Sequence, residues 1–211
     1  MVNENARKTN RENALKKLEE HRKKGLVDED VIFLLELINA YPFMYTTSSC
    51  SGRIVLMYVP PSEKKYECER IGKRHYEVSE DVVVDSLRKR LEDRRREGYV
   101  ILKQEPPIID IAVKDMESAQ KLLSAGRAAG FKNSGIKSYN PKRGYEALVE
   151  LWSTERLDVP VARPDYVVPE EYLRRVVRLA NKKLLRSKLK LQRLYELILE
   201  VFGPPDRYRA P

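Results

Sequence analysis

The amino-acid sequence predicts an α+β fold built on a mixed, largely antiparallel sheet with flanking helices. Strand-like and helix-like segments alternate, but the strands come in adjacent pairs joined by short turns, which favours antiparallel pairing over a doubly wound parallel sheet. No P-loop or dinucleotide-type glycine motif is present, so we expect a non-Rossmann fold. A long basic and amphipathic segment near the C-terminus is expected to form one helix. A barrel-like closure of the sheet and an internal duplication are both compatible with this pattern.

Capping residues and glycines define the expected helices. Thr9 or Asn10 suits the N-cap of the first helix and Gly25 its end, while Asp115 and Gly130 delimit a later helix in the same way. Acidic residues lead the second helix, as the helix dipole favours. The expected helices span residues 10–24, 27–40, 79–97, 115–129 and 172–195.

Short apolar runs bounded by turn signals predict the strands. A serine- and glycine-rich turn follows the first strand, a Pro–Pro turn separates the middle pair, and a turn with proline and glycine joins a later pair. The expected strands span residues 43–47, 53–59, 66–78, 99–103, 108–113, 131–139, 145–151 and 157–161. Residues 162–169 contain two prolines and are expected to be a linker.

The length of 211 residues suits a single domain with a sizeable core. Within this domain we expect an N-terminal helix at residues 1–26 and an α/β catalytic core at residues 27–165. A basic C-terminal helix at residues 166–211 is expected to pack on that core.

The composition excludes several classes of protein. With 42% hydrophobic and 35% charged residues, the chain is too apolar to be disordered and too charged to span a membrane. Residues 1–24 lack the apolar stretch of a secretory signal, and two cysteines, Cys50 and Cys68, are too few for a disulfide scaffold or a four-cysteine zinc site. We therefore expect a cytoplasmic protein without a bound metal. High charge and only three glutamines suit a heat-adapted protein.

The positive charge is concentrated in one segment. Residues 172–195 contain nine basic and no acidic residues, and the rest of the chain is formally neutral. Apolar residues recur in this segment at helical spacing, so one face of the helix is expected to pack on a core. Because the run lacks acidic residues of its own, we expect an anionic partner, and nucleic-acid phosphates are the favoured one. A solvated helix face is the alternative.

The densest polar segment spans residues 46–53, between two apolar strands. It offers five hydroxyls, a thiol and a guanidinium beside Gly52, whose lack of a side chain lets a ligand approach the backbone. A solvated hairpin turn explains the same composition. Cys50 is a nucleophile only with a base such as His75 nearby, and a small buried thiol is the simpler interpretation. His75 itself is either a proton acceptor or an exposed bystander.

Further polar groups lie beside apolar strands. Glu105 and Asp110 flank the Pro–Pro turn, and Asp110 lies inside an apolar strand, where a side chain that points into a pocket is a candidate base. A strand-edge carboxylate that faces water is the alternative. The sequence Asn133-Ser134-Gly135 at a helix exit either binds a ligand or forms a capping turn.

Several of these segments together resemble the tRNA wybutosine-synthesising protein 3 family. The strongest resemblance is at residues 46–54, TTSSCSGRI, and the next at residues 130–136, GFKNSGI. The other matching positions, in chain order, are residues 24–30, His75, Glu105-Pro106, and residues 118–120, 157–160, 170–172 and 180–181. The resemblance therefore covers roughly residues 24 to 195.

The resemblance implies a methyltransferase that uses S-adenosyl-L-methionine as its cofactor and has a fold unlike the Rossmann methyltransferases. Members of this family methylate N-4 of a tricyclic, wyosine-type guanine on the 3′ side of the anticodon in phenylalanine tRNA. The expected partner is therefore the anticodon stem-loop of that tRNA. Two positions depart from the family pattern, because Asp110 stands where the family usually has His and Trp152 where it usually has Arg.

The resemblance and the residue chemistry together give three groups of site residues. His75, Asp110 and Arg53 are expected to be catalytic. The residues expected to bind cofactor and substrate are Ser48, Ser49, Ser51, Gly52, Glu105, Asn133, Ser134 and Gly135. The residues expected to bind tRNA are Arg174, Arg175, Arg178, Lys182, Lys183, Arg186 and Lys190. The alternatives are a non-catalytic tRNA-binding module and a divergent paralogue that acts on another modified guanine.

Overall fold

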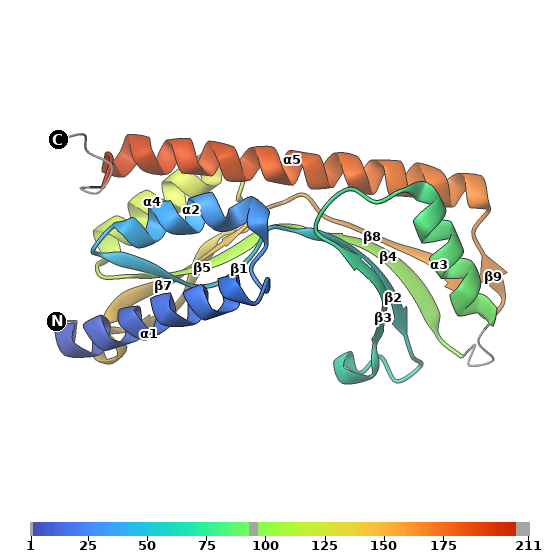
Figure 1. The fold of residues 1–211 in the computed structure, drawn as a ribbon, viewed down its shortest axis with the longest axis horizontal. Helices are drawn as coiled ribbons and strands as arrows, with labels where there is room; N and C mark the ends of the chain where they lie inside the picture. Colours follow the sequence, from blue (N-terminus) through green and yellow to red (C-terminus); the bar gives the residue numbers. More distant parts are fainter. Residues whose placement is uncertain (1, 93–96, 206–211) are drawn as a thin grey trace. The chain divides into compact units, whose positions relative to one another are not determined.

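The computed structural model describes residues 2–92 and 97–205. These residues form two open sheets and five α-helices, and the strand pairings in both sheets are antiparallel (Figure 1). The predicted α+β class is confirmed, and neither sheet closes into a barrel within the described part of the chain. None of the described helices combines the length and the apolar composition needed to cross a membrane.

The chain divides into two compact units that are interleaved along the sequence. The first unit comprises Met1–Ser51, Pro107–Thr154 and Lys188–Pro211, and the second comprises Gly52–Pro106 and Glu155–Ser187. Each unit contains one of the two sheets and a hydrophobic core of its own. The single-domain organisation expected from the sequence stays a prediction.

The first unit is a four-stranded sheet with helices on both faces. Its strands, in sheet order, are β1 (Met44–Cys50), β5 (Ile108–Val113), β7 (Tyr145–Trp152) and β6 (Gly135–Asn140). Its helices are α1 (Glu4–Lys23), α2 (Glu29–Ala40), α4 (Met116–Ala128) and the second half of α5 (Glu170–Phe202). In Figure 1, α2 and α4 lie on one side of the sheet and α1 on the other. The main core lies on the side of α2 and α4, where Leu34, Ile111 and Leu122 are completely buried.

The second unit is a five-stranded sheet covered by helices. Its strands, in sheet order, are β3 (Glu69–Arg74), β2 (Arg53–Val59), β4 (Tyr99–Glu105), β8 (Leu157–Arg163) and β9 (Tyr166–Val167). Its helices are α3 (Glu80–Glu92) and the first half of α5 (Glu170–Phe202). Leu102, Val161 and Val177 are completely buried in its core.

Most helix predictions are confirmed, with shifted ends. α1 begins earlier than residue 10 because Asn3 is its N-cap, and the Asn3 side-chain oxygen accepts a hydrogen bond from the backbone nitrogen of Ala6 at 3.0 Å. α4 follows its predicted cap, Asp115, whereas α2 begins at Glu29, two residues later than predicted. α5 extends beyond residues 172–195 at both ends. The predicted end of the helix at residues 79–97 falls partly on residues 93–96, which lie outside the described residues.

Two predicted turns join strands that belong to different sheets. β1 and β2 flank the Ser51-Gly52 turn, but β1 pairs with β5 while β2 pairs with β3 and β4. β4 and β5 likewise flank the Pro106-Pro107 turn without pairing with each other. The expectation that these strands form adjacent pairs is therefore wrong. Apolar runs mark where a strand lies, but they do not specify which strand it pairs with.

Several strand ends also differ from the prediction. β1 continues to Cys50, so most of the polar segment is strand and not turn. β3 is shorter than residues 66–78, and a single 3₁₀ turn, Lys65–Glu67, precedes it. The short strand β9 lies within the expected linker at residues 162–169, because its backbone pairs with β8.

Gly144 allows α1 to lie against the connection between β6 and β7. Gly144 has a φ angle of +84°, and a Cβ atom there would lie 2.3 Å from the backbone nitrogen of Arg7. We expect Gly144→Ala to lower the free energy of unfolding by more than about 2 kcal/mol, because the left-handed backbone and the close contact both disfavour a side chain. Urea unfolding would measure this loss.

Gly25→Ala is the matched control for this variant. Gly25 also has a positive φ angle, +64°, but a Cβ atom there would have no neighbouring atom within 4 Å. Only the strain of the left-handed backbone remains, so we expect Gly25→Ala to lower the free energy of unfolding by about 1 kcal/mol. Equal losses in the two variants would contradict the importance of the contact with α1.

Candidate functional site

A row of polar residues crosses the sheet of the first unit. In the strand register Ser48 pairs with Asp110, Asp110 with Glu150, and Glu150 with Gly135. Paired residues on neighbouring antiparallel strands point to the same face of a sheet. The residues on either side of Asp110 in β5 are completely buried in the main core, so the row lies on the opposite face. The structure thus brings together three of the predicted site residues, Ser48, Asp110 and Gly135.

The Asp110 carboxylate is held by two donors at one of its oxygens. Oδ2 accepts hydrogen bonds from Ser48 Oγ at 3.0 Å and from Lys137 Nζ at 3.2 Å, and Lys137 Nζ also donates to Glu150 Oε2 at 2.8 Å. The hydrogen bonds to Glu150 and then to Asp110 raise the pKa of Lys137 above its ordinary value. Because carboxylates on facing strand positions repel each other, the Lys137 ammonium stabilises their close approach.

The other carboxylate oxygen of Asp110 is unsatisfied. The side chain is 13% exposed, and its Oδ1 atom is buried with no hydrogen-bond partner among the residues that the structure describes. A buried acceptor without a donor costs free energy and calls for an explanation, of which a catalytic role is one. Asp110 is therefore the strongest candidate for a functional group in the first unit.

Trp152 and Cys50 lie on the same face, next to this row. Cys50 pairs with Ile108 and Ile108 pairs with Trp152, two residues along the strands from the Asp110 row. Both side chains are half-buried, and Cys50 forms no disulfide. The half-buried indole of Trp152 can stack on a base or on adenine.

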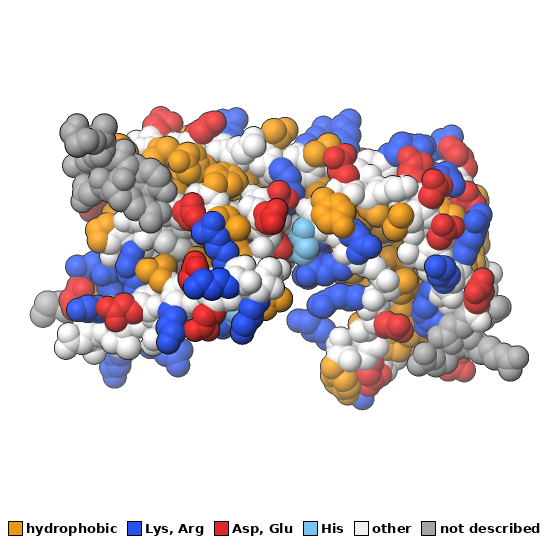
Figure 2. All heavy atoms as spheres, viewed as in Figure 1, with side chains coloured by type: hydrophobic (Ala, Val, Ile, Leu, Met, Phe, Trp, Pro, Cys, Tyr) orange, Lys and Arg blue, Asp and Glu red, His pale blue; other side chains and the backbone are white. Residues whose placement is uncertain are grey.

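A cleft of about 220 Å³ lies between α1 and the polar end of β1. Lys17 and His21 line it from α1, and the hydroxyls of Thr47, Ser48 and Ser49 line it from β1. Figure 2 shows that Lys and Arg side chains, with Asp and Glu among them, cover the outer surface of α1. Of the predicted binding residues, Ser48 and Ser49 therefore face a cavity.

The polar groups of Asn133 and Ser134 hold the chain between α4 and β6. Ser134 Oγ donates to the carbonyl oxygen of Phe131 at 2.5 Å and accepts from the backbone nitrogen of Trp152 at 3.0 Å. The backbone nitrogen of Asn133 donates to the carbonyl oxygen of Trp152 at 3.2 Å. These bonds fit the capping-turn interpretation, and binding of a ligand by these two residues stays a prediction.

Ser51 lies completely buried at the end of β1. Its backbone nitrogen donates to Asp28 Oδ2 at 2.8 Å, and its hydroxyl accepts from Lys188 Nζ at 2.7 Å. Lys188 also pairs with Asp30 at 2.7 Å. Ser51 therefore links β1 to the start of α2 and to α5. Its role in ligand binding stays a prediction.

The second unit contains another group of predicted residues, at the start of β2 and the end of β4. Arg53 and Glu105 are register partners, and Arg53 Nε donates a hydrogen bond to Glu105 Oε2. Their side chains are 25% and 32% exposed. His75 Nδ1 lies 3.1 Å from the carbonyl oxygen of Gly52. Because a carbonyl oxygen can only accept, Nδ1 carries a proton in this contact.

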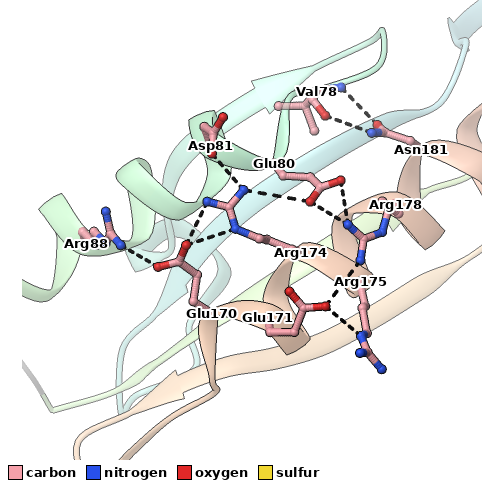
Figure 3. Close-up of polar contacts among 10 residues, drawn as sticks. All are labelled: Val78, Glu80, Asp81, Arg88, Glu170, Glu171, Arg174, Arg175, Arg178 and Asn181. Carbon is pink, nitrogen blue, oxygen red and sulfur yellow. Dashed lines mark hydrogen bonds and ion pairs between the residues drawn. The ribbon is translucent and has the colours of Figure 1, made fainter.

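Three of the cations expected to bind tRNA pair with carboxylates at the start of α5 and in α3 (Figure 3). Arg174 contacts Glu170 and Asp81, each at 2.8 Å, and Arg178 contacts Glu80 at 2.9 Å. Arg175 pairs in the same way with the neighbouring glutamate of α5 at 3.0 Å. The charge of these three arginines is therefore largely neutralised within the second unit.

The remaining predicted cations differ in their environments. Lys183 pairs with Glu155 at 3.2 Å, and Lys190 Nζ donates to the Thr154 hydroxyl at 3.2 Å. Lys182 and Arg186 are exposed and form no ion pair with any residue in the described ranges. The inference that the basic run lacks acidic partners is wrong, because the partners lie just before it or on other elements.

Three residues of these clusters are absent from the sequence-based candidates. Lys137 and Glu150 flank Asp110, and Gln104 lies completely buried beside Glu105 with its Oε1 unpartnered among the described residues. Apolar and polar residues alternate along the second half of β7, and this pattern places Glu150 on the face opposite to its buried neighbours. The sequence therefore contained a signal for Glu150. Only the register of β5 with β7 brings it beside Asp110.

Comparisons with known proteins give a consistent result. A family model described as Methyltransferase TYW3 matches residues 9–200. A Pyrococcus abyssi protein named tRNA(Phe) 7-((3-amino-3-carboxypropyl)-4-demethylwyosine(37)-N(4))-methyltransferase 1 is 41% identical over 189 residues, which are 89% of this chain and 93% of that protein. A Methanocaldococcus jannaschii protein of the same name, without the final numeral, is 36% identical over 173 residues, 81% of this chain and 86% of that protein. The solved structure of PH1069 protein from Pyrococcus horikoshii has a TM-score of 0.80 at 39% identity and covers 90% of this chain and 94% of that chain.

Proposed function

Because the chain belongs to the TYW3 methyltransferase family, we propose that it methylates N-4 of the tricyclic, aminocarboxypropylated guanine next to the anticodon of phenylalanine tRNA. The proposed methyl donor is S-adenosyl-L-methionine. The names of the relatives support the acceptor, and the unsatisfied oxygen of Asp110 is the observation in this chain that supports catalysis.

The residues of the first unit fit such a methyl donor in their chemistry. S-adenosyl-L-methionine presents an ammonium group and hydroxyls, which need acceptors, and a carboxylate, which needs donors. The polar face offers the hydroxyl of Ser49 as a donor and the carboxylate of Asp110, whose side chain is 13% exposed, as an acceptor. When bound, the donor supplies an electrophilic methyl group to the acceptor nitrogen.

Asp110 is suited to take the proton that the acceptor nitrogen loses on methylation. Ser48 and Lys137 both donate to Oδ2, and these two bonds orient the carboxylate. His75 is the second candidate, because histidine is a common general base in catalysis. Asp110 stands where the family usually has His, and both side chains can accept a proton.

Arg53 is proposed to bind a ligand carboxylate. Its Nε is bonded to Glu105, but a guanidinium has further N–H donors on its other two nitrogens. We expect Arg53→Ala to lower kcat/KM about thirtyfold while the fold stays intact, since charged hydrogen bonds contribute about 2 kcal/mol. Steady-state methyl transfer and circular dichroism would measure both.

Arg156→Ala is the matched control for Arg53. Arg156 lies just before β8 and pairs with Asp158 of that strand at 2.6 Å, and its side chain is 51% exposed. Removing it deletes a comparable arginine–carboxylate pair outside the predicted site, so kcat/KM is expected to change less than twofold. The proposed role of Arg53 is wrong if the two variants have the same activity.

Methyl transfer from labelled S-adenosyl-L-methionine tests the proposed reaction directly. One phenylalanine tRNA would carry the aminocarboxypropylated tricyclic guanine without its N-4 methyl group, and the other an unmodified guanine. Label in the first tRNA alone would support the proposal. Donor binding without label in either tRNA would point to another modified guanine as the acceptor. Neither label nor donor binding would favour a non-catalytic tRNA-binding module.

A further inference from the structure

The cleft between α1 and β1 has the lining of an anion site. Two basic side chains, Lys17 and His21, line it from α1, and four hydroxyl-bearing residues of β1 line the opposite wall. No carboxylate lines it among the described residues, although the rest of α1 carries several. The Lys17 ammonium, the His21 ring N–H and the Ser49 hydroxyl can donate hydrogen bonds to an anion. The hydroxyls of the other three β1 residues donate within the protein.

The position of α1 in the first unit is well defined by contacts on both sides of the cleft residues. Arg11 donates to the carbonyl oxygen of Asn39 at 2.5 Å, and Arg22 pairs with Glu36 at 2.8 Å, so both ends of this stretch are tied to α2. Leu18 packs against the main core between them. Lys17 and His21 are four residues apart and therefore lie on one face of the helix.

The cleft is also connected to Asp110. Ser48 lines the cleft, and its hydroxyl donates to Asp110 Oδ2 at 3.0 Å. A ligand group in the cleft would therefore lie beside the carboxylate that is proposed to take the proton. Such a group has to be compact, because the cleft measures about 220 Å³.

We propose that this cleft binds the carboxylate end of an α-amino acid group, with the Lys17 ammonium and the His21 ring as hydrogen-bond donors to it. The proposal rests on the proposed function, in which two ligands carry such a group. One is the aminocarboxypropyl chain of the substrate base, and the other is the methionine part of the methyl donor. The aminocarboxypropyl chain has seven non-hydrogen atoms. At no more than a water molecule's share of volume each, they require at most about 210 Å³, which is within the volume of the cleft.

Direct binding measurements with three ligands test the proposal and separate the two sources. The ligands are S-adenosyl-L-methionine, phenylalanine tRNA with the aminocarboxypropylated base, and the same tRNA with a tricyclic base that lacks this chain. Lys17→Ala is expected to weaken binding of the ligand that occupies the cleft about fivefold, as loss of an accessible ion pair allows. The double variant Lys17→Ala/His21→Ala is expected to weaken it about tenfold or more. Lys16→Ala is the matched control, because Lys16 is on the same helix and does not line the cleft.

Each outcome has a distinct meaning. Weaker binding of the chain-bearing tRNA alone assigns the cleft to the substrate chain, and weaker binding of S-adenosyl-L-methionine alone assigns it to the methyl donor. Equal loss for both tRNAs would place an RNA phosphate in the cleft and overturn the proposal, as would unchanged binding of all three ligands. Wild-type protein that binds the donor but methylates neither tRNA would contradict the proposed reaction, while the binding comparison would still decide the occupant of the cleft.

Discussion

Asp110→Asn is expected to lower kcat about a hundredfold or more while leaving the affinity for S-adenosyl-L-methionine within a few fold. The amide keeps the size of the side chain and can still accept from Ser48, but it cannot take a proton. Single-turnover methyl transfer together with donor-binding titration would separate the two quantities. Equal rates in the variant and the wild type would leave Asp110 as a structural residue of the sheet.

Glu150→Gln tests whether Asp110 takes a proton or only positions Lys137. Glu150 is the nearer partner of Lys137, at 2.8 Å against 3.2 Å for Asp110. If Asp110 acts only by holding Lys137, removal of the Glu150 charge should reduce the rate as much as Asp110→Asn does. We expect a change of only a few fold, because Asp110 keeps its donor from Ser48.

Lys182→Glu/Arg186→Glu is expected to weaken binding of phenylalanine tRNA about a hundredfold at physiological salt. These two side chains are exposed and have no ion-pair partner among the described residues, so both are available for phosphates. Each lost phosphate contact should also reduce the slope of log K against log salt by about 1 unit. Filter binding at several salt concentrations would measure both effects.

Lys65→Glu/Lys89→Glu is the control for net charge. Both lysines are exposed and belong to the same unit, and the double variant changes the formal charge of the chain by the same amount. A comparable loss of tRNA affinity would show that long-range electrostatics is sufficient and that α5 makes no phosphate contacts. Lys183 is left unchanged because its pair with Glu155 is part of the second unit's structure.

The family, the α+β class and most of the elements could be predicted from the sequence. The cap Asp115 and the glycine that ends α4 act through neighbouring backbone groups, so short-range patterns are sufficient to find them. The polar segment at residues 46–53 was recognisable as a candidate site because its composition contrasts with the apolar strands around it. The start of α1 was missed because Asn3 lies before a polar stretch without apolar periodicity.

The sequence alone determined which segments are helices and strands, which faces of them are apolar, and to which family the chain belongs. The tertiary structure decided that β1 and β2 join different sheets, that Lys137 and Glu150 lie beside Asp110, and that carboxylates neutralise Arg174 and Arg178. The reason is physical. Capping and periodicity depend on residues a few positions apart, whereas strand pairing and ion pairs depend on groups that are distant in sequence and become neighbours only when the chain folds.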